Sequence, residues 1–131
     1  MAVQFLSEEF MTEATARLND NDTFKSAIAG LSLDVQFVVT DVPDSDTINY
    51  ILTIADGSAE LRLATIEDFD ASITSTYETS SSLSRGELNT QMAFMTGKIK
   101  IGGNPSKLIM HQNVFVAFAN ALKTMDITYA A

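Results

Sequence analysis

The chain has 131 residues, which predicts one domain spanning residues 1–131. Its net charge of −9 argues against nucleic-acid binding, because phosphates require a basic surface. It contains no cysteine, which excludes disulfides and thiolate metal sites and fits a reducing, cytoplasmic location.

The first part of the chain predicts two helices. Ser7 can cap a helix whose apolar residues recur at helical spacing, namely Phe10, Met11, Ala14 and Leu18. The polar run at 19–22 ends this helix. A short second helix then begins at 22–23 and continues through Ile28, and Gly30 is well placed to stop it.

The middle of the chain changes to a period of two, which is typical of strands with one buried face. Apolar and polar residues alternate over 31–40, again over 48–54, and again over 59–63. Asp56-Gly57 between the last two is a strong hairpin signal. A weaker, serine- and threonine-rich strand is expected over 71–77. The first three strands predict an antiparallel meander with one apolar face and one wet face.

The second half predicts two short helices, a strand and a long helix. Residues 78–85 are expected to be helical by context and to end at Gly86, and Asn89 is expected to cap the next short helix. Residues 98–101 alternate lysine with isoleucine, as in an amphipathic strand. Asn104 followed by proline places a capping residue and a first-turn proline at the start of a helix over 104–125.

The last helix is apolar around most of its circumference. It contains the unbroken apolar run 114–119, whereas a helix packed on one sheet needs only one apolar stripe. The remaining apolar surface must be buried against the other helices, against a partner subunit, or against a ligand held between helix and sheet. Periodicity alone leaves these alternatives open.

Catalytic signatures are absent from the sequence. The single histidine is His111, and no nucleophile elbow, phosphate loop or zinc-binding helix motif occurs. The sequence therefore predicts no metal site, no cofactor and no enzyme activity. One enzymatic alternative is a small cone-shaped α+β isomerase or cyclase that uses His111 with an acid such as Asp34 in an apolar pocket.

The C-terminal half resembles the sterol carrier protein type 2 family of lipid-transfer domains. The resemblance rests on Asp70-Ala71-Ser72-Ile73-Thr74, on Gly86-Glu87-Leu88-Asn89, and on the run from Ala93 to Asn104, which reads AFMTGKIKIGGN. It continues into the apolar helix at Leu108 and His111-Gln112. It implies an α+β fold with a five-stranded, mostly antiparallel sheet, helices covering one face, and an apolar tunnel between them.

This resemblance implies binding or transfer of a fatty acid, a fatty acyl-CoA, a sterol or another lipid. The residues predicted to line the tunnel are inward-facing apolar residues of the strands and of the later helices, with some expected to be ordinary core: Leu33, Val35, Leu52, Leu61, Leu63, Ile73, Met95, Ile99, Ile101, Met110, Phe115, Phe118 and Leu122. Asp34, Gln36 and Arg62 should then face away from the tunnel, because they alternate with the lining residues. A one-residue shift in the strand register would reverse this assignment, since it moves every side chain to the other face of the sheet.

The partners expected are a lipid or another apolar small molecule, with transient membrane contact and a homodimer left open. A homodimerising interaction module is thus a third reading beside the carrier and the isomerase. The chain ends Tyr129-Ala130-Ala131 rather than in a Ser-Lys-Leu type signal, so the peroxisomal location of some relatives is not expected to transfer.

Overall fold

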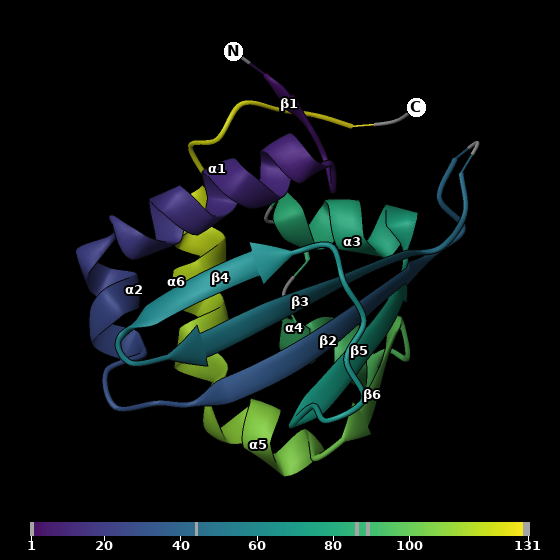
Figure 1. Ribbon diagram of the computed structural model, residues 1–131. Coiled ribbons are helices and arrows are strands. Elements are labelled where there is room, and N and C mark those ends of the chain that lie inside the picture. Colours follow the sequence, from purple (N-terminus) through teal and green to yellow (C-terminus); the bar gives the residue numbers. More distant parts are fainter. Residues whose placement is uncertain (1, 44, 86, 89, 130–131) are drawn as a thin grey trace.

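The computed structural model describes residues 2–43, 45–85, 87–88 and 90–129. Helices cover one face of a five-stranded sheet in an α+β arrangement (Figure 1). The elements in chain order are β1 (Val3–Gln4), α1 (Glu8–Asn19), α2 (Asp22–Ala27), β2 (Leu33–Thr40), β3 (Ile48–Ala55), β4 (Ser58–Arg62), β5 (Ala71–Thr76), α3 (Tyr77–Ser84), α4 (Thr90–Met95), β6 (Ile99–Gly103), α5 (Pro105–Met110), α6 (Gln112–Leu122) and β7 (Ile127–Thr128).

The sheet has the order β4-β3-β2-β5-β6. The predicted meander of β2, β3 and β4 is confirmed, and Asp56 and Gly57 turn its second hairpin with φ of 53° and 77°. Strand β5 lies beside β2 in parallel, while the other neighbouring pairs are antiparallel. Because β4 is at one edge and β5 beyond β2, the connection 63–70 must cross the outer face of the sheet (Figure 1).

The strand register places the predicted apolar residues on one face. Val35 lies opposite Leu52 on β3 and opposite Ala71 on β5, so alternate residues on either side share its face. Asp34, Gln36 and Arg62 occupy the alternate positions and therefore face outward, as the sequence predicted.

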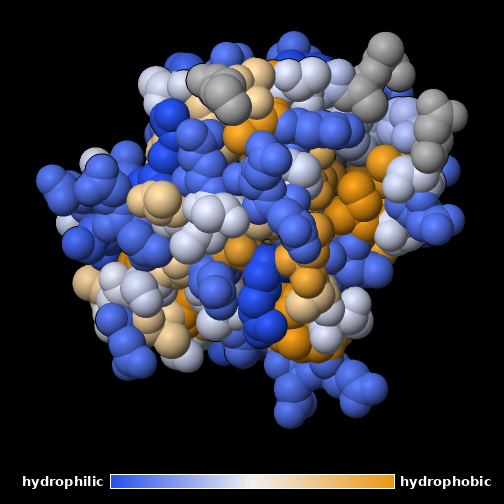
Figure 2. All heavy atoms as spheres, turned by 45° about the horizontal axis from the view of Figure 1, so that its top comes forward, coloured by the Kyte–Doolittle hydropathy of each residue, from blue (hydrophilic) through white to orange (hydrophobic). Residues whose placement is uncertain are grey.

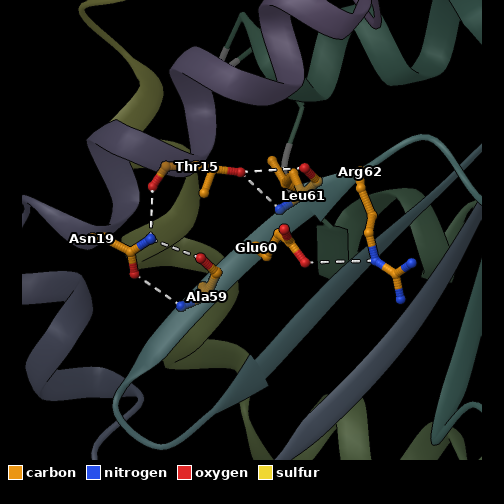
Figure 3. A network of polar contacts seen from close by, with 6 residues as sticks. All are labelled: Thr15, Asn19, Ala59, Glu60, Leu61 and Arg62. Atoms are coloured by element: carbon orange, nitrogen blue, oxygen red, sulfur yellow. Dashed lines mark hydrogen bonds and ion pairs between the residues drawn. The ribbon is translucent and has the colours of Figure 1, made fainter.

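Helix α1 protects the free edge of the sheet at β4 (Figure 3). The Asn19 amide donates to the Ala59 carbonyl at 2.8 Å and accepts from the Ala59 N–H at 2.9 Å. One turn earlier, the Thr15 hydroxyl accepts from the Leu61 N–H at 2.8 Å and donates to the Leu61 carbonyl at 3.3 Å. These side chains take the place of a further strand, so backbone groups that would pair with another chain are already bonded.

The outer face is closed over Gln36 by the crossing connection. The Gln36 side chain is 3% exposed, its carbonyl accepts from the Ile66 N–H at 2.8 Å, and its amide donates to the Ala64 carbonyl at 3.2 Å. The same amide donates to the Tyr50 carbonyl at 3.0 Å. A buried amide needs such partners, so Gln36 fixes the connection against the sheet.

The final helix differs from the sequence prediction. A single helix over 104–125 is wrong, because His111 has φ −111° and ψ 33°, which lie outside the helical region and separate α5 from α6. The predicted start is confirmed, since the Asn104 side chain accepts from the Lys107 N–H with proline in the first turn. The break lets α5 approach β5 while α6 packs against α1, α2 and α3.

The helix starts predicted for the N-terminal half are confirmed by the capping contacts. The Ser7 side chain accepts from the Phe10 N–H, and α1 buries the four predicted apolar residues. The predicted end of α3 at Gly86 and the predicted cap at Asn89 lie outside the described residues.

Candidate functional site

The candidate site is the apolar layer between the sheet and the helices, and the structure distributes the thirteen predicted lining residues over three environments. Those that are buried are Leu33, Val35, Leu52, Leu61, Ile73, Ile99 and Leu122. Those that are half-buried against this core are Ile101, Phe115 and Phe118. Those that are exposed are Leu63, Met95 and Met110. The first two groups share one continuous apolar layer, and the third group lies at the protein surface.

Phe37 is a residue of the helix-covered face that is only partly buried. It lies on β2, the central strand, and its alternation with Val35 puts it on the helix-covered face. Its neighbours in the sheet are Tyr50 on β3, whose ring stacks on it at 4.6 Å, and Ile73 on β5. Val35, one step along the same face, is fully buried, yet Phe37 is only half-buried. The helical layer thus buries Phe37 less completely than Val35.

Phe37 and Tyr50 also belong to this apolar layer but are not among the predicted lining residues. Both follow the same period-two alternation that identified Leu33, Val35 and Leu52. That alternation was the signal that could have found them, because it assigns every second residue of a strand to the same face.

Polar side chains also lie inside the apolar layer. Burial raises the pKa of the Tyr50 hydroxyl well above its usual value. The Ser75 and Ser80 hydroxyls bond each other at 2.6 Å between β5 and α3. Among the described residues the buried Ser81 hydroxyl has no hydrogen-bond partner. An unpaired buried hydroxyl is unfavourable unless a partner is supplied.

The described structure has two hollows, and the second borders this layer, because its lining includes Phe5, Ile48 and Tyr77 of the apolar core. One of about 530 Å³ is on the outer face of the sheet and is lined by Asp34, Thr53, Arg62, Ile66, Glu67 and Asp68. The other, of about 180 Å³, lies beside the N-terminal segment, between the β2–β3 connection and Tyr77. Neither hollow contains a predicted lining residue. The deepest residues of the apolar layer, such as Val35 and Leu52, are fully buried.

The pair suggested for an isomerase is not brought together in an apolar pocket. Asp34 lines the polar outer hollow, which does not include His111. His111 is instead the residue at which α5 ends and α6 begins, with its backbone N–H donating to the Lys107 carbonyl at 3.2 Å. Within the described part of the chain there is no group of three or more His, Asp or Glu side chains that could hold a metal ion.

Asp70 ties the strands to α5 at the edge of this layer. Its carboxylate accepts from the Lys107 ammonium at 2.6 Å and from the Asp34 N–H at 2.8 Å. Its carbonyl accepts from the Asn104 N–H at 3.0 Å. Gly103 permits this close approach with φ of 73°, because a Cβ there would lie 2.8 Å from the Asp70 carbonyl oxygen.

This arrangement predicts a pH-dependent contribution to stability. The Lys107 hydrogen bond, with that from the Asp34 backbone, lowers the pKa of Asp70 in the folded state. The contribution should be fully present above the unfolded pKa and be lost as pH falls through the folded one. Since both side chains are about one-third exposed, we expect a modest effect. Urea unfolding of the wild type and Asp70→Asn from neutral to acid pH measures it. Equal pH dependence of the two proteins would contradict the prediction.

In the described part of the chain, none of the helices has both the length and the apolar character needed to cross a membrane.

Solved structures of known proteins share this fold. Sterol carrier protein 2 matches with a TM-score of 0.79 and 14% identity, over 93% of this chain and 99% of that one. Palmitated SCP2L2 from Aedes aegypti matches with a TM-score of 0.60 and 18% identity, over 89% and 95%. A stereoselective inverting sec-alkylsulfatase from Pseudomonas sp. matches with a TM-score of 0.58 and 20% identity, over 82% of this chain but only 16% of that one. The fold therefore occurs both by itself and within an enzyme.

A search among curated proteins found no match. The model of the SCP-2 sterol transfer family matches residues 12–116, which include most of α1, all five strands of the main sheet and about half of α6. This match agrees with the architecture and with the apolar layer described above. The chain therefore belongs to the SCP-2 sterol transfer family.

Proposed function

We propose that the protein binds one amphipathic lipid between its sheet and its helices and carries it without catalysing a reaction. Family membership supports a lipid as the ligand. The observation that carries the proposal is that Phe37, on the central strand, is only half-buried on the helix-covered face. An apolar ring left accessible on the covered face is stabilised when an apolar ligand removes it from water.

The proposed lining consists of the buried and half-buried residues of the predicted set together with Phe37 and Tyr50. In the layer's deepest part, at Val35 and Leu52, the side chains are closely packed. Binding would therefore begin at the half-buried residues, which are Phe37, Ile101, Phe115 and Phe118. Leu63, Met95 and Met110 are exposed and are not part of the proposed lining.

A fatty acid is the ligand class we propose first. The Tyr50 and Ser81 hydroxyls give the layer polar groups that could bond a carboxyl or hydroxyl head. The relative from Aedes aegypti is described as palmitated, which supports palmitate as a probe. A fatty acyl-CoA, a sterol or another lipid belongs to the same proposal as an alternative ligand.

The experiment is a titration with a fluorescent fatty acid and displacement by palmitate. We expect saturable binding of one ligand per chain. Phe37→Ala should weaken it about tenfold, because a large apolar contact is lost. Val38→Ala is the matched control, since Val38 is half-buried on the same strand but faces outward. An absence of saturable binding would reject the proposal, as would equal effects of the two substitutions.

We further propose that the protein is not an enzyme and that it is located in the cytoplasm. The separation of Asp34 from the apolar layer supports a carrier over the isomerase. General acid–base catalysis would require the Asp34 carboxylate to reach a substrate bound in that layer. The cysteine-free composition is consistent with a reducing compartment.

A further inference from the structure

The smaller hollow lies at one end of the apolar face of the sheet. It has a volume of about 180 Å³, and its lining includes Ile48, the first residue of β3. Ile48 lies opposite Val39 in the strand register, and the next pair on the same face is Tyr50 with Phe37. Two residues of a strand span about 7 Å. The hollow therefore adjoins the half-buried part of the apolar face.

The N-terminal segment forms one wall of this hollow. Phe5 and Leu6 both line the hollow, and both are buried. The Phe5 ring contacts the rings of Tyr77 at 5.7 Å and Tyr129 at 5.0 Å. The end of the apolar layer is thus closed by residues near the chain ends and not only by the main sheet and the helices packed on it.

The N-terminal segment is held in place by a very short strand pair. Strand β1 pairs in parallel with β7 through Val3 with Ile127 and Gln4 with Thr128, and neither strand joins the main sheet (Figure 1). The Phe5 N–H donates to the Thr128 carbonyl at 2.9 Å. Figure 2 turns this end of the molecule forward, and hydrophobic residues come to the surface there between hydrophilic ones. Chain ends paired by so few residues open more readily than the strands of a larger sheet.

Leu6 joins this strand pair to α1 in a strained conformation. Its φ is 65°, in the left-handed region that a leucine rarely adopts. The next residue, Ser7, already caps α1 by accepting from the Phe10 N–H at 3.1 Å. Movement of the segment about Leu6 would release the strained conformation and leave the cap of α1 intact. Strained backbone of this kind is common where a segment switches between two positions.

We propose that β1, β7, Phe5 and Leu6 form a gate through which the lipid enters and leaves the apolar layer. When this terminal gate opens, Ile48 is uncovered, and an acyl chain can pass from Ile48 to the half-buried Phe37. When it closes, Phe5 and Leu6 separate the bound chain from water. The proposal rests on the proposed function, because it assigns the route into the same site.

The lining of the two hollows favours this route over the outer face of the sheet. Among the described residues that line the smaller hollow none is charged. The larger hollow is lined by charged side chains that include Asp34, Arg62 and Glu67, and it lies on the face of the sheet opposite the helices. An acyl chain that passes through the smaller hollow removes no charged group of this lining from water, which would be unfavourable.

The test uses a disulfide that holds the terminal gate closed. The chain has no cysteine, so Gln4→Cys/Thr128→Cys can form only one intramolecular disulfide. Both side chains are exposed, and the two residues are register partners. Neighbouring strands lie about 4.8 Å apart, which is within the Cα range of disulfides.

Uptake and release of a fluorescent fatty acid are measured by stopped flow for the oxidised and the reduced form of this variant. We expect both rates to be at least about tenfold lower in the oxidised form and to recover on reduction. The equilibrium affinity should be unchanged, because the gate is closed both in the empty and in the loaded protein. A gate thus differs from a residue of the binding surface, such as Phe37, whose replacement should change the affinity.

Two further variants complete the test. Thr53→Cys/Glu60→Cys is the matched control, since it joins register partners of β3 and β4 on the outer face, and its oxidation should change neither rate. Phe5→Ala needs no cross-link and acts in the opposite direction. It removes the aromatic contacts that hold the gate closed, so uptake and release should both become about tenfold faster at unchanged affinity.

The outcomes separate the gate from the proposed function. Equal rates in the oxidised and reduced forms, with normal affinity, would overturn the gate and retain the carrier. A lower affinity on oxidation that comes from faster release would also overturn the gate, because these residues would then belong to the binding surface. If the wild type shows no saturable binding, the proposed function is rejected and the gate with it.

Discussion

Replacing Phe118 by alanine is expected to weaken fatty-acid binding about tenfold while lowering the free energy of unfolding by only about 1–2 kcal/mol. Phe118 is half-buried on α6, and its ring meets that of Phe24 edge-on at 6.5 Å. Phe115, three residues earlier, is on the same side of the helix and is also half-buried. A side chain that faces accessible space loses less packing on truncation than one in a filled core.

Phe24 provides the control for this prediction. It is fully buried on α2, so Phe24→Ala should lower the free energy of unfolding by about 3–5 kcal/mol through lost burial and a residual void. Urea unfolding of both empty variants, and titration where both remain folded, make the comparison. A loss of stability in Phe118→Ala as large as in Phe24→Ala, with unchanged affinity, would show that Phe118 is ordinary core.

Replacing Gln36 by alanine is expected to lower the free energy of unfolding by about 3 kcal/mol, because buried groups lose their partners. The Ile66 N–H and the Ala64 carbonyl would lose their bonds to the side chain, and the connection 63–70 would lose its anchor on the outer face. Fatty-acid affinity should change little at temperatures where the variant is folded, since Gln36 faces away from the apolar layer.

Gln112→Ala is the matched control, because Gln112 is exposed on α6 and should change stability by less than about 0.5 kcal/mol. Urea unfolding of both variants measures the difference. Similar midpoints for the two would contradict the role given to Gln36.

The sequence predicted the strands and their register because one face of the sheet is buried. Period-two alternation marks every second residue for the same face, and Asp56-Gly57 sets the turn that aligns β3 with β4. The start of α1 could equally be predicted from the sequence, since the Ser7 cap is a local interaction between residues three apart. These features depend on neighbours in the chain or on a repeating pattern.

The features that the sequence did not predict depend on contacts between distant segments. No glycine or proline marks the break at His111, which accompanies the separate packing of α5 and α6. The pairing of β1 with β7 joins residues near opposite ends of the chain, and β5 joins β2 only because residues 63–70 cross the sheet. Apolar character likewise did not distinguish Met95 and Met110, which are exposed, from Ile99, which is buried.

The central claim is that one chain holds one lipid, and native mass spectrometry of the purified protein tests it most directly. This measurement reports the bound mass and the number of subunits together. The proposed function predicts a monomer with one added mass of a lipid, which is removed by delipidation and restored by palmitate. A dimer that takes up no palmitate would contradict it.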